Sequence, residues 1–102
     1  MKYKISKTNT YENKLINIIS YLVTNFSSVV AKEYLNYLDN QIRNLETFPY
    51  IGKEILLIEG YQCRSLISKK NIVLYYVDEE NKTVHLLYIA SANENYLNLL
   101  RP

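Results

Sequence analysis

GYQCRSLISKKNIVLYYVDEENKTVHLLYIASANENYLNLL, residues 60–100, is the stretch that decides the fold of this chain. Its apolar runs, separated by polar turns, predict three antiparallel β-strands in a meander, at residues 62–68, 72–77 and 83–90. The middle run is almost wholly apolar, as expected of a central strand that is covered on both faces. After the third strand, Ser91 and Glu94 form a capping box that predicts a short C-terminal helix.

The N-terminal residues predict a strand followed directly by a helix. Residues 2–7 alternate between polar and apolar side chains, with Tyr3 and Ile5 on one face, which is typical of a half-buried strand. Asn9 and Glu12 then resemble a capping box, with the asparagine as the cap of the first helix.

Residues 11–47 predict a helical hairpin, because apolar residues recur at spacings of three and four. Ser27 and Ser28 interrupt the pattern and can cap the second helix. Phe48 precedes a proline and therefore disfavours helix, so the second helix should end by Thr47. The buried stripes are expected to contain Tyr11, Leu15, Ile18, Ile19, Leu22, Val23 and Phe26 in the first helix, and Ala31, Leu35, Leu38, Ile42 and Leu45 in the second.

The order of these elements predicts an α+β fold of two layers: an N-terminal strand, a helical hairpin, a three-stranded antiparallel meander and a short C-terminal helix. Residues 53–59 contain an apolar run that fits either a loop packed on the core or an edge strand. With 102 residues, the chain is expected to form a single domain, residues 1–102, with one modest core.

Composition and charge limit the classes of function. Hydrophobic residues make up 48% of the chain, which excludes a disordered protein, and a net charge of +2 is too small for nucleic-acid affinity of the whole molecule. Two predicted strand regions, residues 1–7 and 60–77, hold basic residues and no acidic ones. The first region holds Lys2, Lys4 and Lys7, and the second holds Arg64, Lys69 and Lys70. Depending on the order of the strands in the sheet, these residues either form one basic face or are separate solubilising charges at strand edges.

A single cysteine, Cys63, excludes an intrachain disulfide and a zinc cluster built from thiols. We expect no metal and no small-molecule cofactor, and Cys63 is expected to be a small buried side chain. No apolar run is long enough to span a membrane, and the first residues lack the apolar segment of a signal peptide. A cytoplasmic protein without membrane association is therefore expected.

Three short patterns, in this order and at these spacings, resemble the RelE/ParE superfamily of bacterial toxins: Leu45-x-x-Phe48-Pro49-x-x-Gly52, then Arg64-Ser65-Leu66, then Ile72-Val73-Leu74-Tyr75-Tyr76-Val77-Asp78. Each pattern is mostly hydrophobic, so the match depends on their order in a chain of this length. The similarity covers nearly the whole chain and implies the toxin component of a type II toxin–antitoxin module, inhibiting growth and neutralised by a cognate antitoxin.

The resemblance implies one of two modes of action. RelE-like members cleave messenger RNA in the ribosome, using basic residues that stabilise charge while a ribose hydroxyl is deprotonated. ParE-like members bind DNA gyrase and perform no chemistry of their own. Whether this chain is an enzyme therefore stays open, and its target is either DNA gyrase or the ribosome with its mRNA.

Carried over to this sequence, the resemblance implies candidate site residues. Arg64 matches the arginine of the second strand, and Lys69 and Lys70 fall in a turn that is often basic, so these three are candidates for binding nucleic acid or another target. Tyr75 matches the tyrosine of the third strand but is expected in the core. Tyr96 matches the tyrosine that often follows the last strand in these toxins. It is either a residue of the toxic site or an apolar contact that docks the last helix.

His85 is the only histidine and, with Arg64 and Tyr96, a candidate catalytic residue, although a strand histidine that is packed or surface-facing is the better interpretation. Ile16 and Tyr21 lie off the main apolar stripe of the first helix and are candidate antitoxin contacts.

Two departures from the RelE-like pattern favour the ParE-like mode. Ile72 stands where these nucleases often have an arginine, and Asn93-Glu94 replaces a basic pair, where a carboxylate would repel phosphate. The alternatives are a RelE-like ribosome-dependent mRNA endonuclease and a degenerate, non-toxic homologue that still binds an antitoxin.

Overall fold

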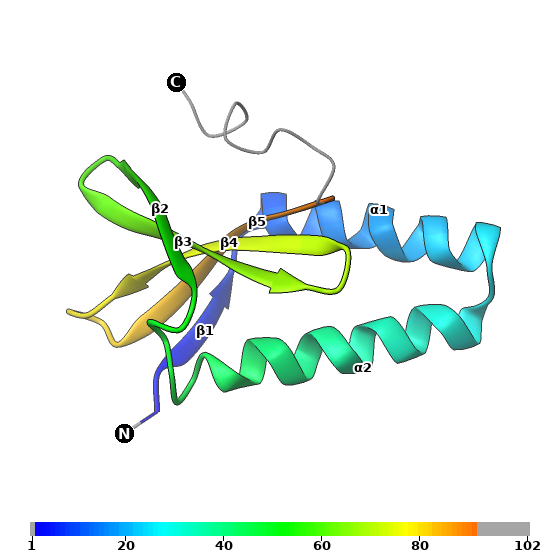
Figure 1. Ribbon diagram of the computed structural model, residues 1–102, viewed down its shortest axis with the longest axis horizontal. Coiled ribbons are helices and arrows are strands. Elements are labelled where there is room, and N and C mark those ends of the chain that lie inside the picture. Colours follow the sequence, from blue (N-terminus) through cyan, green and yellow to red (C-terminus); the bar gives the residue numbers. More distant parts are fainter. Residues whose placement is uncertain (1, 92–102) are drawn as a thin grey trace.

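A five-stranded sheet and an α-helical hairpin form the two layers of the protein, as Figure 1 shows. The structure, a computed structural model, describes residues 2–91. Its elements are β1 (Lys4–Lys7), α1 (Asn9–Asn25), α2 (Ser28–Asn44), β2 (Lys53–Ile58), β3 (Tyr61–Ser68), β4 (Asn71–Asp78) and β5 (Thr83–Ser91). The predicted α+β fold is confirmed, while the predicted C-terminal helix lies outside the described residues.

The strands lie in the order β1-β5-β4-β3-β2. β1 runs parallel to β5, and the other neighbouring pairs are antiparallel, so the predicted meander forms the middle of the sheet. β2 is an edge strand that pairs with β3, so the apolar run within residues 53–59 forms a strand and not a loop. The pairing is irregular between Glu54 and Leu56.

The strand register separates the two basic regions. Lys4 pairs with Thr83 at the start of β5. Asn71, directly after Lys69 and Lys70, pairs with Ser91 at the end of β5. Lys4 and the β3–β4 turn therefore lie at opposite ends of the sheet, while Lys7 pairs with Leu86 in the middle of β5, so the two regions do not form one continuous basic face.

The main core lies between the hairpin and the sheet. Its fully buried side chains include Tyr11, Leu38, Leu45 and Tyr75. A smaller apolar cluster uses alternate residues of β4 and packs on the other face of the sheet. The prediction that β4 is a central strand covered on both faces is confirmed.

The start of α1 corrects one prediction, because the cap is Thr8 and not Asn9. The Thr8 hydroxyl accepts a hydrogen bond from the Tyr11 amide at 3.1 Å and donates to the Leu87 carbonyl at 3.1 Å. The same side chain therefore caps the helix and ties it to β5, a contact that local sequence does not reveal. In α2 the Ser27 hydroxyl accepts from the Val30 amide, so the serine cap is confirmed.

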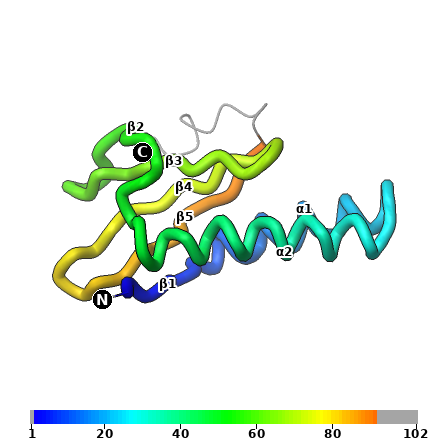
Figure 2. The backbone as a smooth tube through the Cα atoms, turned by 60° about the horizontal axis from the view of Figure 1, so that its bottom comes forward, coloured from blue at the N-terminus to red at the C-terminus, as the bar shows by residue number. Residues whose placement is uncertain are grey.

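The far end of the hairpin corrects a second prediction, because Val23 and Phe26 are 47% and 63% exposed. α1 begins beside the middle of β5, where Lys7 pairs with Leu86. From there the strand continues for about 17 Å, whereas a helix of 17 residues spans about 25 Å. The tip of the hairpin therefore extends beyond the sheet, as Figures 1 and 2 show.

Candidate partner-binding groove and the loop held by Arg64

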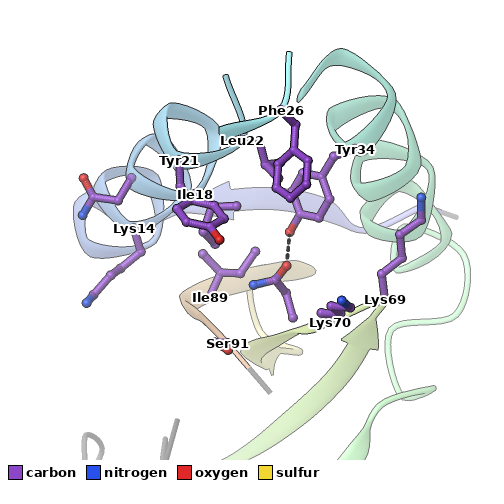
Figure 3. Close-up of a pocket in the computed structure, with 12 residues that line it drawn as sticks. Lys14, Ile18, Tyr21, Leu22, Phe26, Tyr34, Lys69, Lys70, Ile89 and Ser91 are labelled. Carbon is purple, nitrogen blue, oxygen red and sulfur yellow. Dashed lines mark hydrogen bonds between the residues drawn. The ribbon is translucent and has the colours of Figure 1, made fainter. Parts of the chain in front are cut away.

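A groove of about 660 Å³ opens where the hairpin leaves the sheet (Figure 3). We call it the hairpin groove. One wall is α1, the facing side is Tyr34 of α2 with the β3–β4 turn, and Ile89 of β5 lies between them. The side chains from α1 are Lys14, Asn17, Ile18, Tyr21, Leu22 and Phe26, and those from the β3–β4 turn and the first residue of β4 are Lys69, Lys70 and Asn71.

The chemistry of the hairpin groove is apolar inside and basic at its border. Tyr21 and Phe26 are 59% and 63% exposed, and their rings meet edge to face at 6.3 Å. Of the described residues that line it, three are lysines and none is acidic. Such a groove fits the apolar face of an amphipathic segment that also carries carboxylates.

Hydrogen bonds hold the β3–β4 turn against α2. The Tyr34 hydroxyl donates to Asn71 Oδ1 at 2.8 Å, and Asn71 Nδ2 donates to the Ala90 carbonyl at 3.3 Å. Burial raises the pKa of Tyr34 to about 12, so this hydroxyl keeps its proton at neutral pH. The Lys69 ammonium lies 4.5 Å from the ring centroid of Tyr37, a cation–π contact that places this lysine beside α2.

Arg64 is engaged within the protein. Its Nη1 donates to the carbonyls of Tyr50 at 3.1 Å and Gly52 at 2.9 Å, and its Nη2 pairs with Glu54 at 3.0 Å. The guanidinium also lies over the Tyr50 ring, at 4.9 Å from the centroid, and the side chain is only 14% exposed. These contacts place the charge of Arg64 beneath the loop that joins α2 to β2.

Tyr75 holds the same loop from inside the core. Its hydroxyl donates to the Pro49 carbonyl at 2.8 Å and accepts from the Gly52 amide at 2.8 Å. A Cβ on Gly52 would lie 2.5 Å from this hydroxyl and 2.8 Å from the Ser65 carbonyl oxygen, so only glycine fits there. The predicted core position of Tyr75 is confirmed, and its hydroxyl has the additional role of fixing the loop.

A third polar cluster closes the end of the sheet beyond this loop. The Glu79 carboxylate accepts hydrogen bonds from the hydroxyls of Tyr50 and Tyr3 and pairs with the Lys82 ammonium at 2.9 Å. The bonds from Tyr50, Lys82 and Tyr3 lower the pKa of Glu79 to about 2, so the carboxylate is ionised at neutral pH.

His85 lies on β5 and faces Asp78, with Nε2 at 3.3 Å from Oδ2. Its ring stacks on Tyr76 at 4.8 Å, and Tyr76 in turn contacts Tyr61 at 4.5 Å. Hydrogen bonds from Asn81, and then from His85, hold the pKa of Asp78 below its ordinary value. A histidine oriented by a carboxylate is an arrangement that can accept a proton, and this pair is 26% and 18% exposed.

The structure brings together only some of the residues singled out in the sequence. Tyr21, Lys69 and Lys70 meet at the hairpin groove. Ile16 is 60% exposed but lies outside the groove lining, and Arg64 of β3 bonds the loop at residues 48–51 and not the groove. Tyr96 lies outside the described residues.

Sequence reasoning missed the apolar lining of the groove, because it assigned the exposed Phe26 to the buried stripe. Ile18 and Leu22 do pack against the core as predicted, and they also line the groove. The length of α1 could have indicated this groove, because the apolar stripe of the helix is longer than the part of the sheet that it can cover.

Within residues 2–91, no three His, Cys, Asp or Glu side chains gather closely enough to hold a metal ion. None of the helices in that part of the chain is both long and apolar enough to span a membrane.

The arrangement of sheet and hairpin defines the class, which is the two-layer fold of RelE/ParE toxins. A chain of the chromosomal ParDE toxin–antitoxin system from P. aeruginosa aligns with a TM-score of 0.72 at 16% identity, over 88% of this chain and 96% of that chain. A mutant of the E. coli toxin RelE in the free state aligns with a TM-score of 0.63 at 14% identity, over 98% and 94%. The RelBE2 toxin–antitoxin complex from Mycobacterium tuberculosis aligns with a TM-score of 0.61 at 20% identity, over 89% and 99%.

Within this class, the chain belongs to the family of ParE toxins of type II toxin–antitoxin systems, of the parDE kind, whose model matches residues 5–96. No curated protein matches the chain. The resemblance that the three sequence patterns indicated is therefore confirmed.

Proposed function

We propose that this chain is a cytoplasmic toxin that arrests growth by binding a protein target, with DNA gyrase as that target, and that a cognate antitoxin neutralises it. Membership of the ParE family supports the toxin assignment. The contacts of Arg64 favour a binding mode over a nuclease mode. Its guanidinium already holds two carbonyls and a carboxylate, and the Arg64 side chain is only 14% exposed, so it is poorly placed to hold phosphate.

The hairpin groove is the proposed antitoxin site. Its apolar walls match one face of an amphipathic segment, and Lys69 and Lys70 at its border match acidic side chains on that segment. Tyr21 contributes to the same site. Ile16 lies on the same helix outside the groove, and its contact with the antitoxin is a separate part of this proposal.

The second candidate function is ribosome-dependent cleavage of mRNA, and the His85–Asp78 pair is the observation that favours it. In this mechanism His85 accepts the proton of the attacking ribose hydroxyl while Asp78 holds the ring. Lys69 and Lys70 lie at the far end of the same sheet, beside Asn71 and not beside Asp78, which weakens this candidate.

Inducible expression in a bacterial host, without an antitoxin, tests the proposal. Growth arrest is expected, together with inhibition of DNA supercoiling when the purified chain is added to purified gyrase. New 5′ ends in cellular messages, with gyrase unaffected, would replace the binding mode by the nuclease mode. Normal growth with soluble, folded protein would instead identify a non-toxic homologue.

The antitoxin site is tested with the product of an adjacent antitoxin-like gene. Reversing two charges at the groove, Lys69→Glu with Lys70→Glu, should weaken the complex about tenfold and reduce its salt dependence. The matched control, Lys2→Glu with Lys4→Glu, makes the same change in net charge at the opposite end of the sheet and should leave affinity nearly unchanged. Equal losses in both variants would place the antitoxin elsewhere.

A further inference from the structure

The loop at residues 48–51, between α2 and β2, presents large apolar side chains to solvent. Phe48 and Ile51 are each 62% exposed and Tyr50 is 46% exposed, while Pro49 between them is buried. With Thr47, these residues surround a shallow hollow of about 380 Å³. Contiguous exposed apolar residues of this kind mark interaction sites, whereas single ones need no explanation.

The backbone of the 48–51 loop is held rigidly from beneath. Tyr75 bonds the Pro49 carbonyl and the Gly52 amide, and Arg64 bonds the carbonyls of Tyr50 and Gly52. The Tyr50 side chain is also fixed, by the Arg64 guanidinium over its ring and by its bond to Glu79. A loop fixed in this way loses little conformational entropy when it binds a partner.

Two carboxylates border the loop and decide the kind of partner that it fits. Glu54 is 63% exposed while its partner Arg64 is 14% exposed, so the acid is the outward member of this pair. Glu79 accepts a hydrogen bond from the Tyr50 hydroxyl and is already paired with Lys82 at 2.9 Å, and its side chain is 48% exposed. A surface that complements the loop therefore has an apolar hollow with arginine or lysine side chains around it.

We propose that the 48–51 loop is the surface that binds the protein target of this toxin, with Phe48 and Ile51 inserted into an apolar hollow bordered by basic side chains. The inference rests on the proposed function, and it names the surface through which that function is performed. Three partly exposed side chains offer on the order of 300 Å². A standard protein–protein interface buries roughly 800 Å² on each partner, so the loop would be the central anchor of a larger contact surface and not the whole of it.

In this arrangement Arg64 is a positioning residue. It does not touch the target but fixes the backbone that presents Phe48 and Ile51. The same role falls to the Tyr75 hydroxyl.

The test compares two double variants of the full chain, expressed from the same inducible promoter without an antitoxin. Phe48→Ser with Ile51→Ser removes the proposed contact. Leu57→Ser with Ile67→Ser removes two equally exposed apolar side chains, 66% and 68%, from β2 and β3. The melting temperature and soluble yield of each variant are measured beside growth arrest. The loop variant should lose arrest by at least about tenfold in the inducer needed, with a melting temperature close to that of the wild type, whereas the control variant should arrest growth normally.

Growth arrest by the loop variant at the wild-type inducer level would overturn this inference and leave the proposed function intact. Loss of arrest in both variants, with both folded, would also overturn it, because the effect would not be specific to the loop. Failure of the wild-type chain to arrest growth, or cleavage of messages by it, would overturn the proposed function, and this inference with it.

Discussion

Positive charge has different roles at the two ends of the sheet. At the hairpin groove, Lys69 and Lys70 lie exposed on a turn, at the border of apolar side chains that the sheet does not reach. At the 48–51 loop, Arg64 is directed inward and bonds two backbone carbonyls and a carboxylate. In the sequence these three residues form one basic segment, but only the lysines can meet a partner directly.

The comparison shows that a charge near a predicted site is informative only when its hydrogen-bond partners are known. A guanidinium with three internal acceptors stabilises the fold, since charged hydrogen bonds contribute about 1.5 to 3 kcal/mol each when they are partly buried. A solvated lysine contributes little to stability and remains available to an acidic partner. Substitutions at the two ends should therefore affect different properties, stability at one and binding at the other.

The largest effect is expected from Gly52→Ala at the loop end. The added Cβ would lie 2.5 Å from the Tyr75 hydroxyl and 2.8 Å from the Ser65 carbonyl, so the loop or the strand must move. We expect a loss of about 3 kcal/mol in the free energy of unfolding, measured by urea denaturation.

The matched control is Gly60→Ala, because Gly60 has φ +87° and no atom within 4 Å of its added Cβ. Backbone strain alone should cost about 1 kcal/mol there. If the two glycine variants lose equal stability, the close contact of the loop with Tyr75 is not what holds it.

Arg64→Gln should lower the free energy of unfolding by about 2 kcal/mol, since the carbonyls of Tyr50 and Gly52 lose their charged donor. Lys70→Gln, on the exposed turn, should change it by less than about 0.5 kcal/mol. Both values come from the same urea titrations. A stable Arg64→Gln protein that has lost toxicity would show that Arg64 serves binding and not stability, which would remove the contrast between the two ends.

The smallest effect is a pH dependence at Glu79. Its pKa in the folded protein is about 2, below the ordinary value of 4.5, so its contribution to stability is complete above pH 4.5 and is lost as the pH falls toward 2. Glu79→Gln cannot titrate, so its melting temperature should fall less than that of the wild type between pH 4.5 and pH 2.5. Parallel curves for the two proteins would mean that the bonds from Tyr50 and Tyr3 do not persist in solution.

Much of the fold could be predicted because local patterns determine it. Alternation in β1, the apolar run of β4 and the three–four spacing of the helices all match the described elements. The helix start at Thr8 was missed because the Thr8 hydroxyl also bonds Leu87, nearly eighty residues away in the sequence. The status of residues 53–59 was undecidable for a similar reason, because an edge strand is defined by its neighbour β3.

The sequence alone determined the order of the described elements other than β2, the fold class and the resemblance to the toxin superfamily, because each depends on periodicity or on the spacing of apolar patterns along the chain. Only the tertiary structure decided the roles of the candidate site residues. The register of β1 on β5 places Lys4 far from the β3–β4 turn, and the offset of α1 along β5 leaves Tyr21 and Phe26 uncovered. The pairing of β2 with β3 brings Glu54 opposite Arg64, so that Arg64, which the sequence suggested as a ligand of nucleic acid or another target, pairs with a carboxylate of its own chain. These outcomes depend on contacts between distant segments, and a pattern read along one segment carries no information about its neighbours in space.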